Sequence, residues 1–232
     1  MSQVILKDKK VLITAGPTKE AIDPVRFISN HSSGKMGYAI AEEFLKQGAK
    51  VVLVSGPVHV ELSHPNLTIL NVESASDMYL ACCLHFETCD IAVFSAAVAD
   101  YRPAKVASQK IKKDDSSFVI KLVKNVDIAA EFGKFKLSNQ VSVGFALETN
   151  DELNHAMGKL RKKNLDMVVL NSMNDAKATF GYDTNKVSVI TSQLKQYNYE
   201  LKSKKDVARD VVKHVAELTL VKESFEEFIK VA

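Results

Sequence analysis

Tryptophan is absent from this sequence of 232 residues, which contains only three cysteines, five prolines and nine glycines. Cys82, Cys83 and Cys89 are odd in number and lack Cys-x-x-Cys spacing, so the sequence indicates neither a disulfide framework nor a zinc ribbon. His85 lies among them as a conceivable metal ligand, but the apolar stretch MYLACCLHF is more typical of packed core. We therefore expect reduced cysteines that pack in the core.

Neither sign of charge dominates, because 31 Lys and Arg residues stand against 28 Asp and Glu residues, a net charge of +3 at pH 7. That balance does not favour a nucleic-acid binder, which carries a clear basic excess. No run approaches the roughly 18 apolar residues of a membrane-spanning helix, and the start (MSQVILKDKK) lacks the apolar core of a signal peptide. We expect a cytoplasmic protein.

The length allows one large domain or two small ones, and 46% hydrophobic with 25% charged residues is ordinary for a globular protein; we expect a single domain, 1–232. Apolar runs alternate with helical patterns, which predicts a doubly wound α/β fold with a mainly parallel, Rossmann-like sheet covered on both faces. Ser74 or Ser76 is the expected N-cap of the second helix. The predicted strands span 11–16, 50–56, 67–72, 90–97, 141–147, 165–171 and 186–192, and the predicted helices span 36–49, 74–86, 151–163 and 204–220.

One segment, 101–123, has no helical period. Its part KIKKDDSSFVIKLV predicts two short polar strands around an Asp-Asp-Ser-Ser turn. A lysine-rich hairpin has little apolar surface to bury, so we expect it to protrude from the sheet as a flap or arm, with a solvated edge hairpin as the alternative. The tail, 221–232, is predicted to be either a terminal helix or disordered.

The segment SSGKMG (32–37) directly precedes the first predicted helix. Gly34 and Gly37 permit close approach of a ligand, and the backbone N–H groups of a helix N-terminus favour a phosphate. The P-loop motif is absent, because Met36 occupies the position of the magnesium-binding hydroxyl. A weak phosphate-site prediction follows from these residues alone.

A short-chain NAD(P)-dependent oxidoreductase is an alternative, since HSSGKMGYAIAEEFLKQGAKVVLVSG is similar to the opening of that family. About nineteen residues, however, separate the first strand from the helix, and the second strand ends without an acidic residue for a ribose hydroxyl. The catalytic Tyr-x-x-x-Lys pair must lie on a helix, which the surrounding sequence disfavours for both candidates, Tyr101 with Lys105 and Tyr182 with Lys186.

The long insertion GPTKEAIDPVRFISNHSSGKMG (16–37) closely resembles the signature of bacterial phosphopantothenate–cysteine ligase, the ligase domain usually fused to a flavin-dependent decarboxylase. The resemblance covers roughly residues 9–195, and VILKDKKVLITAG resembles the junction behind that decarboxylase. The chain is then either half of a bifunctional protein or a separate ligase. Further matching blocks follow in the family's order: SAAVADYRP (95–103), KIKK (110–113), KLVKN (121–125), VGFALETN (143–150) and KLRKKNLD (159–166).

This resemblance implies a reaction in coenzyme A biosynthesis. The carboxylate of 4′-phosphopantothenate attacks the α-phosphorus of CTP, and pyrophosphate leaves an acyl-cytidylate behind. The amine of L-cysteine then attacks the activated carbonyl, which gives phosphopantothenoylcysteine and CMP. Mg²⁺ accompanies the triphosphate. The family also forms homodimers, and a protruding hairpin is suited to crossing a two-fold axis.

The resemblance implies two catalytic residues. Lys110 matches the lysine that serves the first half-reaction, where a cation neutralises anions brought together. Asn30 matches the residue linked to handling of the acyl-cytidylate, where an amide can donate to an oxyanion without adding charge. The simpler alternatives are a solvated surface lysine and an asparagine that caps a turn. Lys112 and Lys113 are expected to contribute only general positive charge, without a specific catalytic role.

The matching blocks also imply binding residues. Lys159 and Lys163 lie four apart on a predicted helix and share one face, and Phe145 either walls the cytosine or belongs to the core. Asp100 is a tentative metal contact through the CTP phosphates. The predicted nucleotide-binding residues are Ser95, Ala96, Asp100, Lys110, Lys124, Asn125, Asp127, Phe145, Lys159 and Lys163.

Phosphopantothenate is expected at Arg26, Asn30, His31, Ser32, Gly34, Ala97 and Asp100, with Arg26 and His31 assigned on charge alone. The sequence departs from the family pattern at Val126, where proline is common, and at Ser172, where aspartate is common. These departures put local contacts in doubt rather than the reaction. A nucleotide-binding module without enzymatic activity is the remaining alternative.

Overall fold

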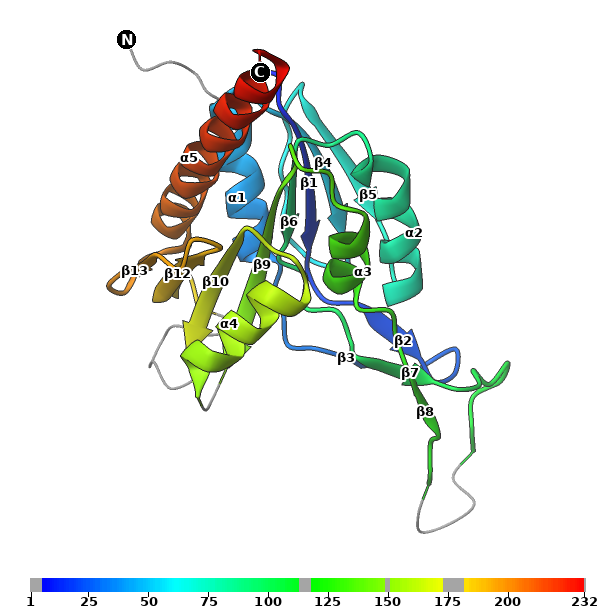
Figure 1. Cartoon of the computed structure of the whole chain (residues 1–232). Coiled ribbons are helices and arrows are strands. Elements are labelled where there is room, and N and C mark those ends of the chain that lie inside the picture. Colours follow the sequence, from blue (N-terminus) through cyan, green and yellow to red (C-terminus); the bar gives the residue numbers. More distant parts are fainter. Residues whose placement is uncertain (1–5, 113–117, 149–150, 173–181, 232) are drawn as a thin grey trace.

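A computed structural model describes residues 6–112, 118–148, 151–172 and 182–231 of the chain. An eight-stranded sheet with the strand order β13-β12-β10-β9-β6-β1-β4-β5 forms its centre (Figure 1). The strands are β1 (Lys10–Ala15), β4 (Lys50–Ser55), β5 (Leu67–Asn71), β6 (Ile91–Phe94), β9 (Val141–Glu148), β10 (Met167–Ser172), β12 (Val187–Thr191) and β13 (Gln196–Asn198).

Six neighbouring strands of this sheet are parallel, namely β5, β4, β1, β6, β9 and β10. β12 and β13 extend the sheet as antiparallel strands. Numbered among themselves, the parallel strands have the order 3-2-1-4-5-6, which is that of the Rossmann fold. The predicted mainly parallel, doubly wound α/β fold is confirmed. The direction of the connections reverses at β1, where the loops after β1 and β6 diverge.

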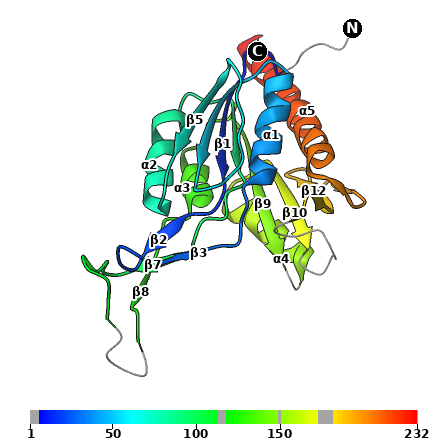
Figure 2. The same cartoon turned by 180° about the vertical axis from the view of Figure 1, so that it is seen from behind.

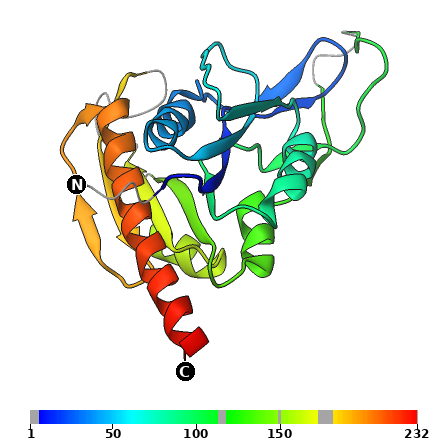
Figure 3. The ribbon, with the colours of Figure 1, turned by 90° about the horizontal axis from the view of Figure 1, so that it is seen from above.

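Helices cover both faces of the sheet (Figures 1 and 2), and Figure 3 shows the same layers from above. α1 (Lys35–Lys46) and α5 (Lys204–Val231) pack together on one face, while α2 (Ala75–Phe86), α3 (Ile128–Phe135) and α4 (Glu152–Lys162) lie on the other. Each face therefore has its own apolar cluster, as expected for a sheet buried on both sides.

Local sequence explains why these elements form. Five of the six residues of β1 are buried, as in a central parallel strand. In α1 the apolar side chains of Ile40, Phe44 and Leu45 pack against the sheet. The Ser74 side chain accepts from the backbone N–H of Asp77, whose carboxylate accepts from the Ser74 N–H, so Ser74 is the N-cap of α2.

Two short ribbons stand beside the carboxyl edge of the sheet. β2 (Lys19–Ala21) pairs with β3 (Phe27–Ser29) inside the long insertion after β1. β7 (Tyr101–Pro103) pairs with β8 (Leu122–Lys124), and the described residues between them, 104–112 and 118–121, extend away from the sheet as an arm (Figure 1). A third ribbon joins β11 (Thr184–Asn185) to β14 (Lys202–Ser203) near the start of α5.

The arm differs from its prediction in detail. The strands that pair, 101–103 and 122–124, lie at its base, whereas KIKK was expected to be a strand and its described residues, 110–112, are not. Residues 110–112 are held by a side chain instead of by strand pairing, because the guanidinium of Arg26 donates to the Ile111 carbonyl. The predicted Asp-Asp-Ser-Ser turn lies outside the described residues.

The C-terminal helix is longer than the sequence predicted. α5 continues through residues 221–231 instead of ending at 220. Lys222 forms an ion pair of 2.8 Å with Asp166 and donates to the Gln140 carbonyl, and Glu223 pairs with Lys9 at 2.5 Å. The segment treated as a separate tail is therefore fastened to the sheet by charged side chains. The helix α3 was not predicted at all.

The cysteines differ partly from expectation. Cys82 and Cys89 pack in the apolar cluster under α2, and burial raises the pKa of each thiol to about 12. Cys83 is exposed, contrary to the prediction that all three pack in the core. Among the helices that the structure describes, none is both long and apolar enough to cross a membrane.

Candidate functional site

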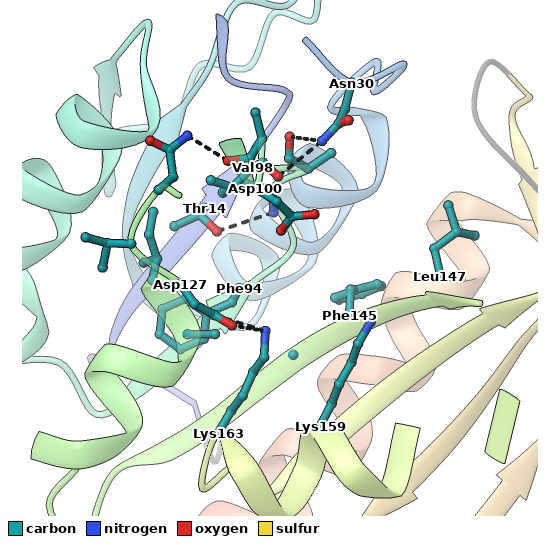
Figure 4. A pocket seen from close by; sticks show the side chains of 18 of the residues that line it. Thr14, Asn30, Phe94, Val98, Asp100, Asp127, Phe145, Leu147, Lys159 and Lys163 are labelled. Carbon is teal, nitrogen blue, oxygen red and sulfur yellow. Dashed lines mark hydrogen bonds and ion pairs between the residues drawn. The ribbon is translucent and has the colours of Figure 1, made fainter. Parts of the chain in front are cut away.

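A pocket of about 390 Å³, which we call the central pocket, opens at the carboxyl ends of β1, β6 and β9 (Figure 4). It lies where the strand connections reverse direction, which is the usual ligand position in open α/β sheets. The loop after β6, the start of α3 and one face of α4 form its walls. It brings together the predicted residues Asn30, Ala96, Ala97, Asp100, Asn125, Asp127, Phe145, Lys159 and Lys163.

Asn30 reaches the central pocket from the chain that follows β3. Its side-chain Nδ2 donates to the carbonyls of Ala97 and Val98, both at 3.1 Å (Figure 4). The reverse orientation of the amide would place Oδ1 against two carbonyl oxygens, so the chemistry of the partners fixes the orientation. The sequence interpretation of a donor to an oxyanion needs correction, because both amide hydrogens already hold the loop after β6. The side-chain oxygen remains as an acceptor.

Asn125 fastens the end of the arm to the same loop. Its Nδ2 donates to the Ala99 carbonyl at 2.7 Å, its Oδ1 accepts from Arg102 at 2.9 Å, and its backbone N–H donates to the Asp100 carbonyl. These bonds set the backbone around Asp100, whose carboxylate is exposed at the pocket. Asn125 therefore connects the base of the arm to the loop that lines the pocket through hydrogen bonds.

Lys159 of α4 and Lys163, the C-cap of that helix, extend into the central pocket from below in Figure 4. Lys163 forms an ion pair of 2.9 Å with Asp127, which is also the N-cap of α3 and accepts from the Ala130 N–H. Lys159 lines the pocket one helical turn earlier, as the four-residue spacing predicted. Two cations and a helix N-terminus thus face one cavity, together with the carboxylates of Asp100 and Asp127.

Phe145 packs against the core, and its predicted role as a wall for the cytosine stays a prediction. It is partly buried and packs against the apolar cluster of α1 and α5, and it also lines the central pocket. Leu147 follows it on the same face of β9. The two side chains form a wall between the central pocket and a second one.

The second pocket, which we call the helix pocket, has a volume of about 150 Å³ and lies at the N-terminus of α1. Gly34 has a φ of +74°, and a Cβ there would approach Val58 to 2.7 Å. At Gly37 a Cβ would lie 2.6 Å from the Cβ of Ala15. Glycine is therefore needed for α1 to begin directly against β1. The predicted residues Ser32, Gly34 and Ser95 line this pocket, together with Ala96 and Ala97.

Four predicted residues lie in neither pocket: Arg26, His31, Lys110 and Lys124. Arg26 donates to the carboxylate of Asp23 and to the Ile111 carbonyl, so it fastens the arm instead of facing a phosphate. Lys110, next to Ile111, is exposed on the arm. Within one chain, Lys110 therefore lies outside the central pocket, which Lys159 and Lys163 line.

Sequence reasoning missed several polar residues of the site. The hydroxyl of Thr14 accepts from the Ala96 N–H at 3.3 Å, and that of Thr18 accepts from the Ala99 N–H at 3.0 Å. The position of Thr14 near the end of the first strand was the available signal for that residue, whereas Thr18 lies in the insertion after the strand. Asn185 and Lys204 line the helix pocket from the C-terminal part of the chain. No local motif marks them, because only the β11–β14 ribbon brings them there.

The described side chains contain no group of three or more His, Cys, Asp or Glu that could hold a metal. A magnesium ion bound together with phosphates needs fewer protein ligands, because it keeps several waters and uses only one or two carboxylates. The exposed carboxylate of Asp100 fits that smaller requirement. It stays a predicted contact.

Strand order and pocket position place the chain among doubly wound α/β proteins that bind ligands beyond the carboxyl edge of the sheet. Residues 6–219 match the family described as the DNA/pantothenate metabolism flavoprotein C-terminal domain. The chain belongs to this family, as the sequence resemblance predicted.

Known proteins agree with that assignment. The crystal structure of the C-terminal domain of the coenzyme A biosynthesis bifunctional protein CoaBC superimposes with a TM-score of 0.79 and 41% identity, covering 93% of this chain and 98% of that one. The bifunctional protein CoaBC of Bacillus subtilis (strain 168) is 42% identical over 214 residues, which are 92% of this chain and 52% of that protein.

A further relative bears a different name. A cysteine/cysteine sulfinic acid decarboxylase of an unknown prokaryotic organism is 48% identical over 216 residues, covering 93% of this chain and 60% of that protein. The chain thus spans between about half and three fifths of these relatives. Their names describe longer proteins, so they do not by themselves assign an activity to the shared segment.

Proposed function

We propose that this chain catalyses the CTP-dependent ligation of 4′-phosphopantothenate with L-cysteine, a step of coenzyme A biosynthesis. The observation that carries the proposal is the central pocket, where Lys159, Lys163 and the N-terminus of α3 face Asn30 across one cavity. A triphosphate joined to a carboxylate substrate needs lysine side chains and backbone N–H donors near its phosphates. The coenzyme A names of the relatives supply the substrate class.

In the first half-reaction, an oxygen of the phosphopantothenate carboxylate attacks the α-phosphorus of CTP. The bond from this phosphorus to the bridging oxygen breaks, and the electron pair leaves with pyrophosphate. Lys159 and Lys163, which line the pocket, hold the phosphate charge in this proposal, and alignment of the two anions supplies most of the remaining catalysis. We assign Lys110 to the same step when the arm closes over the phosphates.

In the second half-reaction, the amine of cysteine attacks the acyl carbonyl carbon of the acyl-cytidylate. The carbon–oxygen bond to the phosphate breaks and CMP leaves with the electron pair. The ammonium nitrogen releases one proton before the attack and another after it, so the product is a neutral amide. Asn30 acts here by holding the carbonyls of Ala97 and Val98, which sets the loop beside the reacting carbon.

Magnesium would supply further charge neutralisation along the phosphates, with Asp100 as the protein carboxylate beside it. Asp100 otherwise orients the loop, since its carbonyl accepts from the N–H of Asn125. The pyrimidine preference rests on the family resemblance, and Phe145 is the ring available to stack on a base.

Two other activities are less well supported. An oxidoreductase of the short-chain type needs its Tyr and Lys on one helix, but Tyr101 lies in β7 and Tyr182 lies outside the helices. A decarboxylase activity is part of the name of one relative, whose matched segment is shared with the CoaBC proteins. The lysine-lined pocket favours chemistry on a polyphosphate over both.

We also propose that the chain forms a homodimer through its ribbons and arm. Apolar side chains there are exposed, including Phe27 at 50%, Phe118 at 53% and Val119 at 88%. Clustered exposed apolar side chains of this kind mark interaction surfaces. A flavin-dependent decarboxylase, as a fused domain or a separate protein, is the proposed metabolic partner, and the cytoplasm is the proposed compartment.

The function is tested by mixing the chain with Mg²⁺, 4′-phosphopantothenate and each nucleoside triphosphate in turn, with and without L-cysteine. We expect pyrophosphate release with CTP before cysteine is added, and phosphopantothenoylcysteine and CMP afterwards. Lys163→Gln should weaken CTP binding by about tenfold, since it removes a charged contact, whereas Lys162→Gln on the same helix serves as the matched control. Absence of pyrophosphate release with every triphosphate would overturn the proposal.

A further inference from the structure

A buried carboxylate connects the β2–β3 ribbon to the start of α2 (Figure 1). Glu20, the middle residue of β2, is only 3% exposed. Its Oε1 accepts a hydrogen bond of 2.9 Å from the backbone N–H of Ala75, the first residue of α2. The first N–H groups of a helix have no acceptor within that helix, and they form the positive end of its dipole. A second bond lies beside this one, because the N–H of Lys19 donates to the Glu73 carbonyl at 2.8 Å.

The burial of Glu20 calls for a reason. Removing a charged carboxylate from water is costly, and an apolar side chain would fill the same space at a lower cost. Glu20 lines neither the central pocket nor the helix pocket, so we assign it no contact with a substrate. What the carboxylate does provide is a directed bond that fixes the ribbon to one end of one helix.

The loop after β6 holds the same ribbon from another side. Thr18, directly before β2, is fully buried, and its hydroxyl accepts from the Ala99 N–H at 3.0 Å. The carbonyl of Thr18 accepts from the hydroxyl of Ser29 at 2.8 Å, which joins the two strands of the ribbon beside Asn30. The ribbon is therefore bonded both to the start of α2 and to the loop that lines the central pocket.

Strand pairing links the position of Glu20 to that of Asn30. Glu20 pairs with Ile28 across the ribbon, and Asn30 follows two residues later. The Asn30 amide in turn donates to the carbonyls of Ala97 and Val98. Because paired strands keep a fixed register, a shift of β2 relative to α2 would move the end of β3 and the Asn30 amide with it.

From these contacts we infer that Glu20 is a positioning residue for the second half-reaction. It holds the ribbon at the N-terminus of α2, and the ribbon holds Asn30 against the loop after β6. The inference rests on the proposed ligase function, to which it adds a residue outside both pockets that sets the geometry of acyl transfer. The first half-reaction depends on Lys159 and Lys163, which the ribbon does not carry, so it should be much less sensitive to Glu20.

The test compares Glu20→Leu, which removes the acceptor, with Glu20→Gln, which keeps a side-chain oxygen for the Ala75 N–H. In Glu20→Leu the cysteine step should slow by about tenfold and the acyl-cytidylate should accumulate in quenched reactions, because small displacements near reacting groups are costly. Pyrophosphate release without cysteine should change by less than about twofold. Glu20→Gln should return the cysteine step to within about threefold of the wild-type rate.

Ser74→Ala is the matched control for the stability of α2. Ser74 is the N-cap of this helix, and its side chain bonds to Asp77 in the first turn. Its loss weakens the same helix end, so it should leave both half-reactions within about twofold of wild type. An equal slowing of the cysteine step in Ser74→Ala and Glu20→Leu would assign the effect to the helix and would overturn the inference.

A double variant tests whether the effect passes through Asn30. If it does, Glu20→Leu should slow the cysteine step of an Asn30→Ala chain by less than about twofold, since the positioned amide is already absent. A further tenfold loss in that background, or an unchanged cysteine step in Glu20→Leu alone, contradicts the inference.

Glu20→Asp keeps the test decisive if Glu20→Leu does not fold. It retains the negative charge but withdraws the acceptor from the Ala75 N–H, so it should slow the cysteine step selectively as well. A Glu20→Asp chain with both half-reactions unchanged would then refute the positioning role. Failure of the proposed ligase would instead be seen in the wild-type chain, as absent pyrophosphate release.

Discussion

At the scale of single residues, the structure changes what Asn30 is expected to do. The sequence interpretation made its amide a donor to reacting oxygen, but the Nδ2 group is occupied by the carbonyls of Ala97 and Val98. Its contribution is thus to position the loop after β6, with Oδ1 left as an acceptor. A positioning residue of this kind should affect the two half-reactions unequally.

Asn30→Asp is predicted to let the acyl-cytidylate accumulate. A carboxylate would lie against two carbonyl oxygens and beside phosphate charge, which should slow the cysteine step by roughly 10²-fold. Quenched reactions analysed by mass spectrometry would detect the intermediate. Asn30→Ala is the matched control, since it removes the donor without adding a negative charge. If no intermediate accumulates in Asn30→Asp while turnover falls, the assigned role is wrong.

At the scale of elements, charged side chains fasten the irregular segments that carry the site. The carboxylate of Asp23 is 2% exposed and accepts from the Arg26 side chain and from the Ile111 N–H, which joins the β2–β3 turn to the arm. The Arg26 guanidinium holds the pKa of Asp23 well below its usual range. Lys136, Lys222 and Asp166 fasten α5 to the sheet in a comparable way.

Asp23→Asn is predicted to loosen the base of the arm. The backbone N–H of Ile111 would lose a charged acceptor, so its hydrogen exchange, measured by NMR, should accelerate by about tenfold. Asp8→Asn provides the control, because Asp8 pairs with Lys50 away from the arm. An unchanged exchange rate at Ile111 would show that other contacts hold the arm.

The pH dependence of this contact has a definite sign. A carboxyl whose pKa is lowered by folding stabilises the folded form above its unfolded pKa, near 3.9, and loses that contribution as the pH falls. In wild type the protection of Ile111 should therefore persist from neutral pH down to about pH 4 and decline only below it. A decline that begins near pH 6 would point to a different titrating group.

At the scale of the whole molecule, Lys110 presents a geometric problem that a dimer would solve. Lys159 and Lys163 line the central pocket with Asn30, whereas Lys110 lines neither pocket of its own chain. An arm that crosses a two-fold axis would bring Lys110 to the partner subunit's pocket. The exposed Phe118 and Val119 beside it would then be covered.

A heterodimer of Lys110→Gln and Asn30→Asp subunits tests this arrangement. Differently tagged subunits are co-expressed, and the mixed dimer is isolated by two affinity steps. If the arm serves the partner, one site contains both native residues, and the activity should be about half that of the wild-type dimer. If the arm serves its own chain, both sites are defective and the activity should stay near zero. Failure to form any dimer would contradict the oligomeric proposal itself.

The sequence by itself determined the alternating elements, the parallel sheet and the family, because apolar periodicity and ordered motifs are local properties that survive without coordinates. It also selected nine of the residues that line the central pocket, since their blocks follow individual strand ends. It did not reveal the extension of α5, the exposure of Cys83 or the pairing of Arg26 with Asp23. Only the tertiary structure decided these, because each depends on what distant segments place beside the residue.

The difference between local patterns and contacts of distant segments also explains why the central pocket could be predicted and the helix pocket could not. The central pocket is built around motifs whose order in the sequence follows the order of the strands, so its composition could be predicted. Asn171, Asn185 and Lys204 meet the N-terminus of α1 only because β10, the β11–β14 ribbon and α5 fold back beside it. The buried Oδ1 atoms of Asn171 and Asn185 have no hydrogen-bond partner among the described residues, a property of that packing that no local pattern of residues records.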